Sequence, residues 1–190
     1  MGRQTAPTAS ISVELFDLIP RRRRLPGEDS VAYDALREAL LNDLNPGTPY
    51  EAALAENLVE LEWEAHRFRT IRDDLWLKRF RHLAKHVFYN PYSDEDEDAE
   101  KAEALADALI SGESKERNAA LVELSQHGVE EGALLAEAYS LERDALSPIE
   151  RHIAELEPRR RRLREDYDQL KGKRIRSNVQ DADVIENNVD

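Results

Sequence analysis

The sequence predicts an all-α protein with two long antiparallel helices, paired like a coiled coil, and a short helical hairpin inserted between them. Three observations lead to this fold class. Ala, Leu, Glu and Arg, all strong helix formers, dominate the 190 residues, and Gly occurs only 7 times. Apolar residues recur every three or four positions over two long stretches. The chain is 41% hydrophobic and 35% charged, which is typical of helices with a narrow apolar seam.

Residues 1–28 are expected to form an N-terminal arm. The segment 11–19 mixes strand and helix signals, and Pro20, four arginines and Pro26-Gly27 follow it. These breakers favour a short strand or an extended arm over a helix.

The first helix is expected to begin at Asp29 or Ser30, either of which can cap it, and to end near Asn45. Pro46 and Gly47 then stop it, because proline lacks an amide hydrogen and glycine accepts turn geometry.

The second helix opens with the clearest local signal in the chain, a capping box. Thr48 can accept a hydrogen bond from the amide of Glu51, and Glu51 can reach back to the amide of Thr48. Pro49 occupies a position where its missing amide hydrogen costs nothing. The apolar spacing continues to about Phe88, so we expect one uninterrupted helix over 48–88.

An insert over about 93–128 follows, with an acidic loop and two short helices at about 99–111 and 114–126. The last helix is expected over 129–171, with a kink or break at Pro148, Pro158 or both. The helical domain therefore covers 29–171, and the polar residues 172–190 are predicted to be a disordered tail. Two seams alone bury little surface, so a second copy or another protein is expected to cover the remainder.

Composition also restricts the class of protein. The chain has no cysteine, which excludes disulfides and thiolate metal sites and favours the cytoplasm. No stretch approaches the roughly 20 apolar residues that a membrane span requires, so no membrane partner is expected.

The sequence offers little that points to catalytic or metal-binding chemistry. His82 and His86 have metal-compatible spacing, but Leu83 stands where the metalloprotease pattern requires Glu, and Arg81 and Lys85 would repel a cation. The acidic residues 94–98 lack the glycine of a calcium loop. We find no phosphate loop and no credible nucleophile set, so we predict no enzyme, no catalytic residue, no metal and no cofactor.

Basic residues are the strongest functional signal, because the formal net charge of −13 is unevenly distributed. Residues 21–24 carry +4, residues 67–85 carry +5 and residues 159–176 carry +6, so the rest of the chain carries −28. The candidate binding residues are Arg21, Arg22, Arg23, Arg24, Arg67, Arg69, Trp76, Lys78, Arg79, Arg81, Arg159, Arg160, Arg161 and Arg162.

Two functions fit these basic blocks. The favoured one is a non-enzymatic adaptor or assembly protein, in which charged helix faces pair with carboxylates of the same chain, a second copy or a protein partner. The alternative is a DNA- or RNA-associated factor, whose arginines follow phosphates while Trp76 and neighbouring aromatics stack on bases.

The segments 25–40 and 44–58, the Trp63/Arg67 region and the later 139–143 segment (Tyr-Ser-Leu-Glu-Arg) resemble a family of uncharacterised bacterial helical proteins. Its members share a Pro-Gly-Glu-Asp opening and long Ala/Leu/Glu/Arg-rich helices, and they are often encoded near mobile elements. The resemblance implies an all-helical fold and no established activity, so it transfers no functional residue. It raises the expectation of a nucleic-acid or phage-type context.

Overall fold

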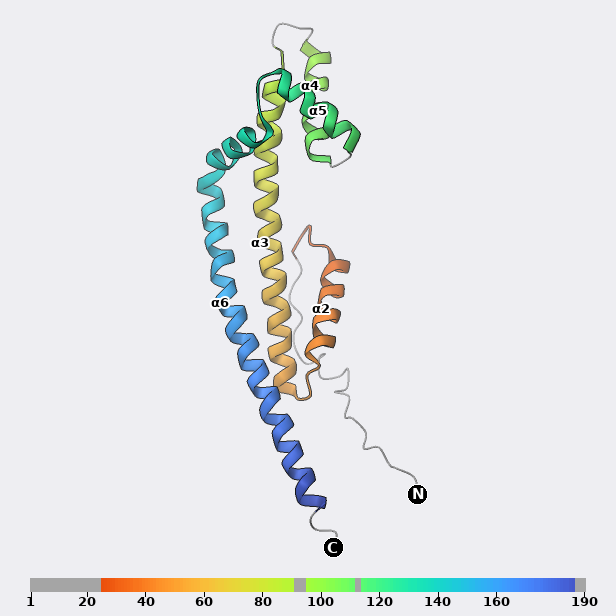
Figure 1. Ribbon diagram of the computed structural model, residues 1–190, viewed down its shortest axis with the longest axis vertical. Coiled ribbons are helices and arrows are strands. Elements are labelled where there is room, and N and C mark those ends of the chain that lie inside the picture. The colour runs from red at the N-terminus through yellow and green to blue at the C-terminus, as the bar shows by residue number, and fades with distance from the viewer. Residues whose placement is uncertain (1–24, 91–94, 112–113, 187–190) are drawn as a thin grey trace. The chain divides into compact units, whose positions relative to one another are not determined.

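The computed structural model describes residues 25–90, 95–111 and 114–186, and the predicted N-terminal arm with Arg21 to Arg24 lies almost entirely outside them. The described residues form five helices and no strand, which confirms the all-α class (Figure 1). They are α2 (Ser30–Leu44), α3 (Pro49–Phe88), α4 (Glu95–Ser111), α5 (Ser114–Gln126) and α6 (Glu131–Glu186).

The chain divides into two compact units, and α3 and α6 each contribute to both. One unit holds α2, α3 as far as His66, and α6 from Ala154 onward. The other unit runs from Arg67 to Ile153 and therefore contains the second half of α3, α4, α5 and the beginning of α6. We call them the α2 unit and the hairpin unit.

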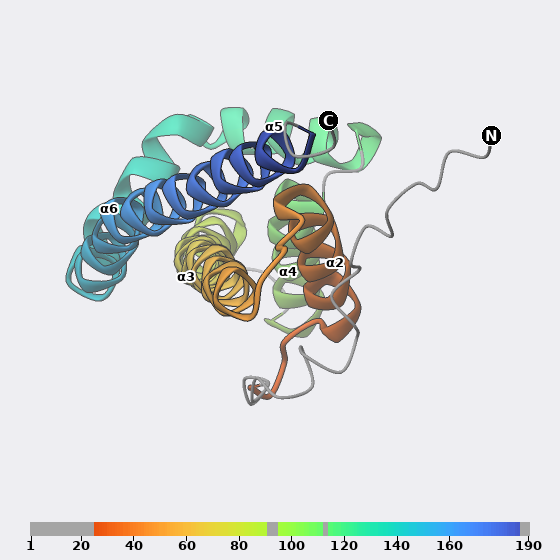
Figure 2. The ribbon, with the colours of Figure 1, turned by 90° about the horizontal axis from the view of Figure 1, so that it is seen from below.

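In the α2 unit, α2 lies alongside the first half of α3 (Figure 2). The Tyr33 hydroxyl donates a 2.6 Å hydrogen bond to Glu60, and Arg37 pairs with Glu56. Asp29 caps α2 as expected, since its carboxylate accepts hydrogen bonds from the amides of residues 31 and 32.

The connection between α2 and α3 is held by side chains from α6. Asn45 ends α2 in the left-handed conformation, with φ of 47°. The Tyr167 hydroxyl and the Lys171 ammonium donate hydrogen bonds of 2.8 and 2.6 Å to the Leu44 carbonyl. These donors satisfy a carbonyl at the helix end, where no intrahelical partner is available.

The capping box at the start of α3 forms only in part. The Glu51 amide donates to the Thr48 hydroxyl at 3.2 Å, as predicted. The Glu51 carboxylate accepts from the Gly47 amide at 2.6 Å and not from the Thr48 amide. It is fully buried and forms an ion pair with Arg174, which draws it toward α6.

The hairpin unit has a core to which four helices contribute. Buried residues from α3, α4, α5 and α6 meet in one cluster: Phe80, Ala84, Phe88, Ala102, Ala106, Leu109, Ala120, Leu124, Leu134 and Ala138. Many of these are alanines, which allow the helices to approach closely. Arg117 of α5 donates a 3.3 Å hydrogen bond to the Leu109 carbonyl near the end of α4 and pairs with Glu131 at the start of α6.

The expected break of α6 does not occur. The helix continues through Pro148 and Pro158, so neither breaks it. The carbonyls that lose a partner belong to Asp144 and Ala154, and both residues are exposed, so water can replace the missing bonds. The segment 172–190 was predicted to be disordered, but it is helical as far as Glu186, and Arg174 ties its beginning to α3.

Candidate functional site

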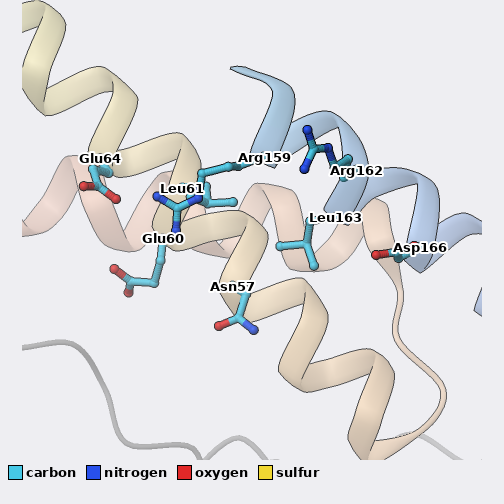
Figure 3. A pocket seen from close by; sticks show the side chains of 8 residues that line it. All are labelled: Asn57, Glu60, Leu61, Glu64, Arg159, Arg162, Leu163 and Asp166. Carbon is cyan, nitrogen blue, oxygen red and sulfur yellow. The ribbon is translucent and has the colours of Figure 1, made fainter. Parts of the chain in front are cut away.

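The α2 unit has a groove between α3 and α6, which we call the α3–α6 groove. Its volume is about 600 Å³. It lies between residues 57–64 of α3 and residues 159–166 of α6 (Figure 3). Its lining consists of Asn57, Glu60, Leu61, Glu64, Arg159, Arg162, Leu163 and Asp166.

The groove combines apolar and charged side chains. Leu61 and Leu163 are half-buried, whereas Arg159, Arg162 and Asp166 are exposed. Arg159 reaches from α6 toward α3, while Arg162 stays over its own helix (Figure 3). Such a surface has the composition of a site for an amphipathic segment, because leucines give apolar contact area and the rim gives charge complementarity.

On the α3 side of the groove, α2 contacts α3 through Tyr33. Glu60 accepts the hydrogen bond from the Tyr33 hydroxyl, and burial together with this bond raises the pKa of Tyr33 well above its ordinary value. Tyr33 also packs edge-on against Trp63, with ring centroids 5.2 Å apart. The Glu60 carboxylate is therefore fixed at one edge of the groove.

The arginine run at 159–162 is divided between two faces of α6. Arg159 and Arg162 line the α3–α6 groove, whereas Arg160 and Arg161 line a second hollow of about 320 Å³ beside α2. Arg160 donates two hydrogen bonds to Glu62, at 2.8 and 3.0 Å, and one to Glu157 at 2.8 Å. The bond to Glu62 is the main reason why the pKa of Arg160 is raised.

Arg159 and Arg162 differ from Arg160 in their electrostatic partners. Within the part of the chain that the structure describes, neither forms an ion pair with a carboxylate. Two exposed arginines without such a partner thus line a groove whose lining is partly apolar. This is the feature of the α2 unit that best fits a binding partner.

Basic residues of the 67–85 block mostly have intramolecular partners in the hairpin unit. Arg79 donates a 2.6 Å hydrogen bond to Glu142. Arg81 pairs with both Asp107 and Glu103 of α4, and Lys85 pairs with Glu103 at 2.8 Å.

These pairs perturb the α4 carboxylates. Lys85 and Arg81 lower the pKa of Glu103 to about 2, and Arg81 lowers that of Asp107. The pKa of Arg81 is raised in turn by its hydrogen bonds to Asp107 and Glu103. The ion pairs connect α4 to α3 along the surface of the hairpin unit.

The remaining candidates of this block are placed differently. The Trp76 indole donates a 3.0 Å hydrogen bond to the Leu135 carbonyl of α6 and packs against the core, so its ring is only partly accessible for stacking on a base. Arg67 lies over the Phe68 ring at 5.3 Å, and Arg69 also has a partner. Lys78 is exposed and lines a small hollow with Arg79 and His82.

Sequence reasoning missed the acidic half of the groove. Glu60 and Glu64 are one helical turn apart, a spacing that places them on one face of α3, but nothing local indicates that this face meets Arg159. Among the described residues, no cluster of three or more metal-ligating side chains occurs, and no helix is long and apolar enough to cross a membrane.

Comparison with known proteins returns no match: no family model, no curated protein and no solved structure is similar enough to count. The resemblance to uncharacterised bacterial helical proteins therefore stays a prediction.

Proposed function

We propose that the chain is a non-enzymatic adaptor or assembly protein that acts in the cytoplasm through its long charged helices. The observation that carries the proposal is the α3–α6 groove, where exposed Arg159 and Arg162 flank the apolar side chains of Leu61 and Leu163. The occupant we assign to it is an acidic helical surface on a second copy of the chain. With a net charge of −13, the chain itself offers many carboxylates that could pair with these arginines.

The proposal includes an antiparallel pairing of α3 and α6 within each unit. In the α2 unit, Glu51 and Glu62 contact Arg174 and Arg160, so the partners run in opposite chain order. In the hairpin unit, Phe68 packs on His152 and Arg79 pairs with Glu142, again in opposite order. An antiparallel pair held by such contacts suits a surface that presents its charges at fixed spacing.

A nucleic-acid function has less support. Arg79, Arg81, Lys85 and Arg160 already neutralise carboxylates of the same unit, and Trp76 is held by a hydrogen bond. Phosphate binding would have to replace those ion pairs. The overall negative charge opposes it further.

An electrophoretic mobility shift with mixed DNA and RNA distinguishes the two functions. The full chain is compared with Arg159→Glu/Arg162→Glu, because reversing the ion-paired Arg79 or Arg81 would also disturb the fold. We expect no shift even at low salt. A shift that weakens steeply with salt and disappears in the double variant would overturn the proposal.

A further inference from the structure

His82 and His86 lie one turn apart on α3, on the exposed surface of the hairpin unit. Their Nε2 atoms are 3.2 Å apart, and the rings meet edge to face with centroids 4.5 Å apart. Two ligands bonded to one ion at about 2.0–2.1 Å and at about 90–109° to each other have their nitrogens roughly 2.9–3.4 Å apart. The two imidazoles therefore already have the separation that a shared metal ion requires.

The surrounding charges are more favourable than the sequence indicates. Arg81 and Lys85 precede the two histidines and would repel a cation, but both are turned toward α4. There Glu103 and Asp107 neutralise them. Lys78 and Arg79 line a hollow next to His82, and Arg79 is paired with Glu142 across it. Lys78 is thus the one nearby cation among the described residues for which no carboxylate partner is found.

We propose that His82 and His86 form a two-histidine chelate for a late first-row divalent metal ion, with solvent in the other coordination positions. Neutral imidazole is a ligand that Cu²⁺, Ni²⁺ and Zn²⁺ prefer, and Ca²⁺ and Mg²⁺ select oxygen ligands instead. The two nitrogens come together only when α3 is helical, so the ion should also stabilise this part of the helix.

The test uses Ni²⁺ as the probe and the full chain as the protein. Isothermal titration is carried out on the wild type, His82→Asn, His86→Asn and the control His127→Asn, which replaces another exposed histidine of the same unit. We expect one ion per chain for the wild type and the control. Each of the other two variants should lose at least about tenfold in affinity, because a chelate binds its second ligand intramolecularly.

Paramagnetic broadening provides a second readout that does not depend on affinity. In the wild type, substoichiometric Ni²⁺ should broaden the imidazole signals of His82 and His86 and leave that of His127 sharp. Equal broadening of all three signals, or wild-type affinity in either His82→Asn or His86→Asn, would overturn the proposal.

Discussion

The Glu51 carboxylate is completely buried at the start of α3, and Arg174, near the far end of α6, places its Nε atom 3.2 Å from it. The Arg174 Nε atom and the Glu51 Oε1 atom are close enough for an ion pair but are not aligned for a hydrogen bond. The Glu51 carboxylate also accepts the Gly47 amide hydrogen. One buried charge thus connects the α2–α3 turn to α6, and the stability of the α2 unit should depend on its partner.

Replacing Arg174 with Gln leaves the buried Glu51 charge without a counter-charge. We expect the free energy of unfolding to fall by about 3 kcal/mol, the lower end for breaking a buried pair, because Arg174 is 28% exposed. Urea denaturation followed by circular dichroism measures the change. Lys173→Gln is the matched control, since Lys173 is exposed, and a loss of equal size in that variant would contradict the role of the pair.

The Arg174 guanidinium occupies the space next to Gly47 that a side chain at that position would need. A Cβ atom added at Gly47 would come within 1.0 Å of the Nη1 atom of Arg174, so alanine at this position must displace the guanidinium. Because moving the guanidinium weakens its ion pair with the buried Glu51, we expect Gly47→Ala to destabilise the fold by up to about 3 kcal/mol. The loss should be much smaller in an Arg174→Gln background, because the group that clashes is gone. A double-mutant cycle in urea measures the coupling, and additive losses would rule out this contact as the cause.

Tyr167 gives the α2 unit a dependence on alkaline pH. Its hydroxyl is buried on the Leu44 carbonyl, and burial, with Glu51 nearby, raises its pKa to about 12. The raised pKa favours the neutral hydroxyl, so this stabilisation is complete below the ordinary pKa of 10 and is lost as the pH rises toward 12.

Tyr167→Phe should remove that pH dependence and lower the free energy of unfolding by about 1 kcal/mol at neutral pH, the usual net contribution of a hydrogen bond. Tyr50→Phe is the control, because the Tyr50 side chain belongs to the same unit and is exposed. Urea denaturation at neutral and alkaline pH compares the two variants. A difference in stability between the wild type and Tyr167→Phe that stays constant from neutral pH to pH 12 would contradict the assignment.

Acid should loosen the contact between α4 and α3. Lys85 and Arg81 lower the pKa of Glu103 from 4.5 to about 2. A lowered folded-state pKa contributes stability above 4.5 that is lost as the pH falls from 4.5 toward 2. Between pH 4.5 and 2, we expect the free energy of unfolding of Glu103→Gln to fall less than that of the wild type. Carboxyl chemical shifts of Glu103 during an acid titration check the cause, and a midpoint near 4.5 would contradict it.

Helix positions followed from the sequence because their signals are local. Asp29 as a cap and Thr48 as the first half of a capping box need only neighbouring residues. The second half of that box failed because Glu51 has a distant partner, Arg174, and such a pairing depends on the register between two helices. The break expected at Pro148 or Pro158 of α6 failed for a related reason, since the cost of a proline depends on whether water reaches the freed carbonyl.

The candidate site was likewise predicted from the sequence only in part. Arg159 to Arg162 were recognised as a basic block, but the helical turn sends Arg159 and Arg162 to one groove and Arg160 to Glu62. The pair of Arg160 with Glu157 is local, but no local pattern shows that Arg160 also pairs with Glu62, because that partner lies on α3. The histidine spacing was visible, yet the repulsion expected from Arg81 and Lys85 is offset by α4 carboxylates that only the fold brings near.

Self-association through the α3–α6 groove is tested most directly by sedimentation velocity over a wide concentration range. The wild type is compared with Arg159→Glu/Arg162→Glu. The control is Lys115→Glu/Arg151→Glu, which makes the same change in charge at two exposed residues outside the groove. We predict that the wild type and the control shift to a larger species as concentration rises, while the groove variant stays monomeric. A wild-type chain that is monomeric at every concentration, or a groove variant that associates like the control, would contradict the account.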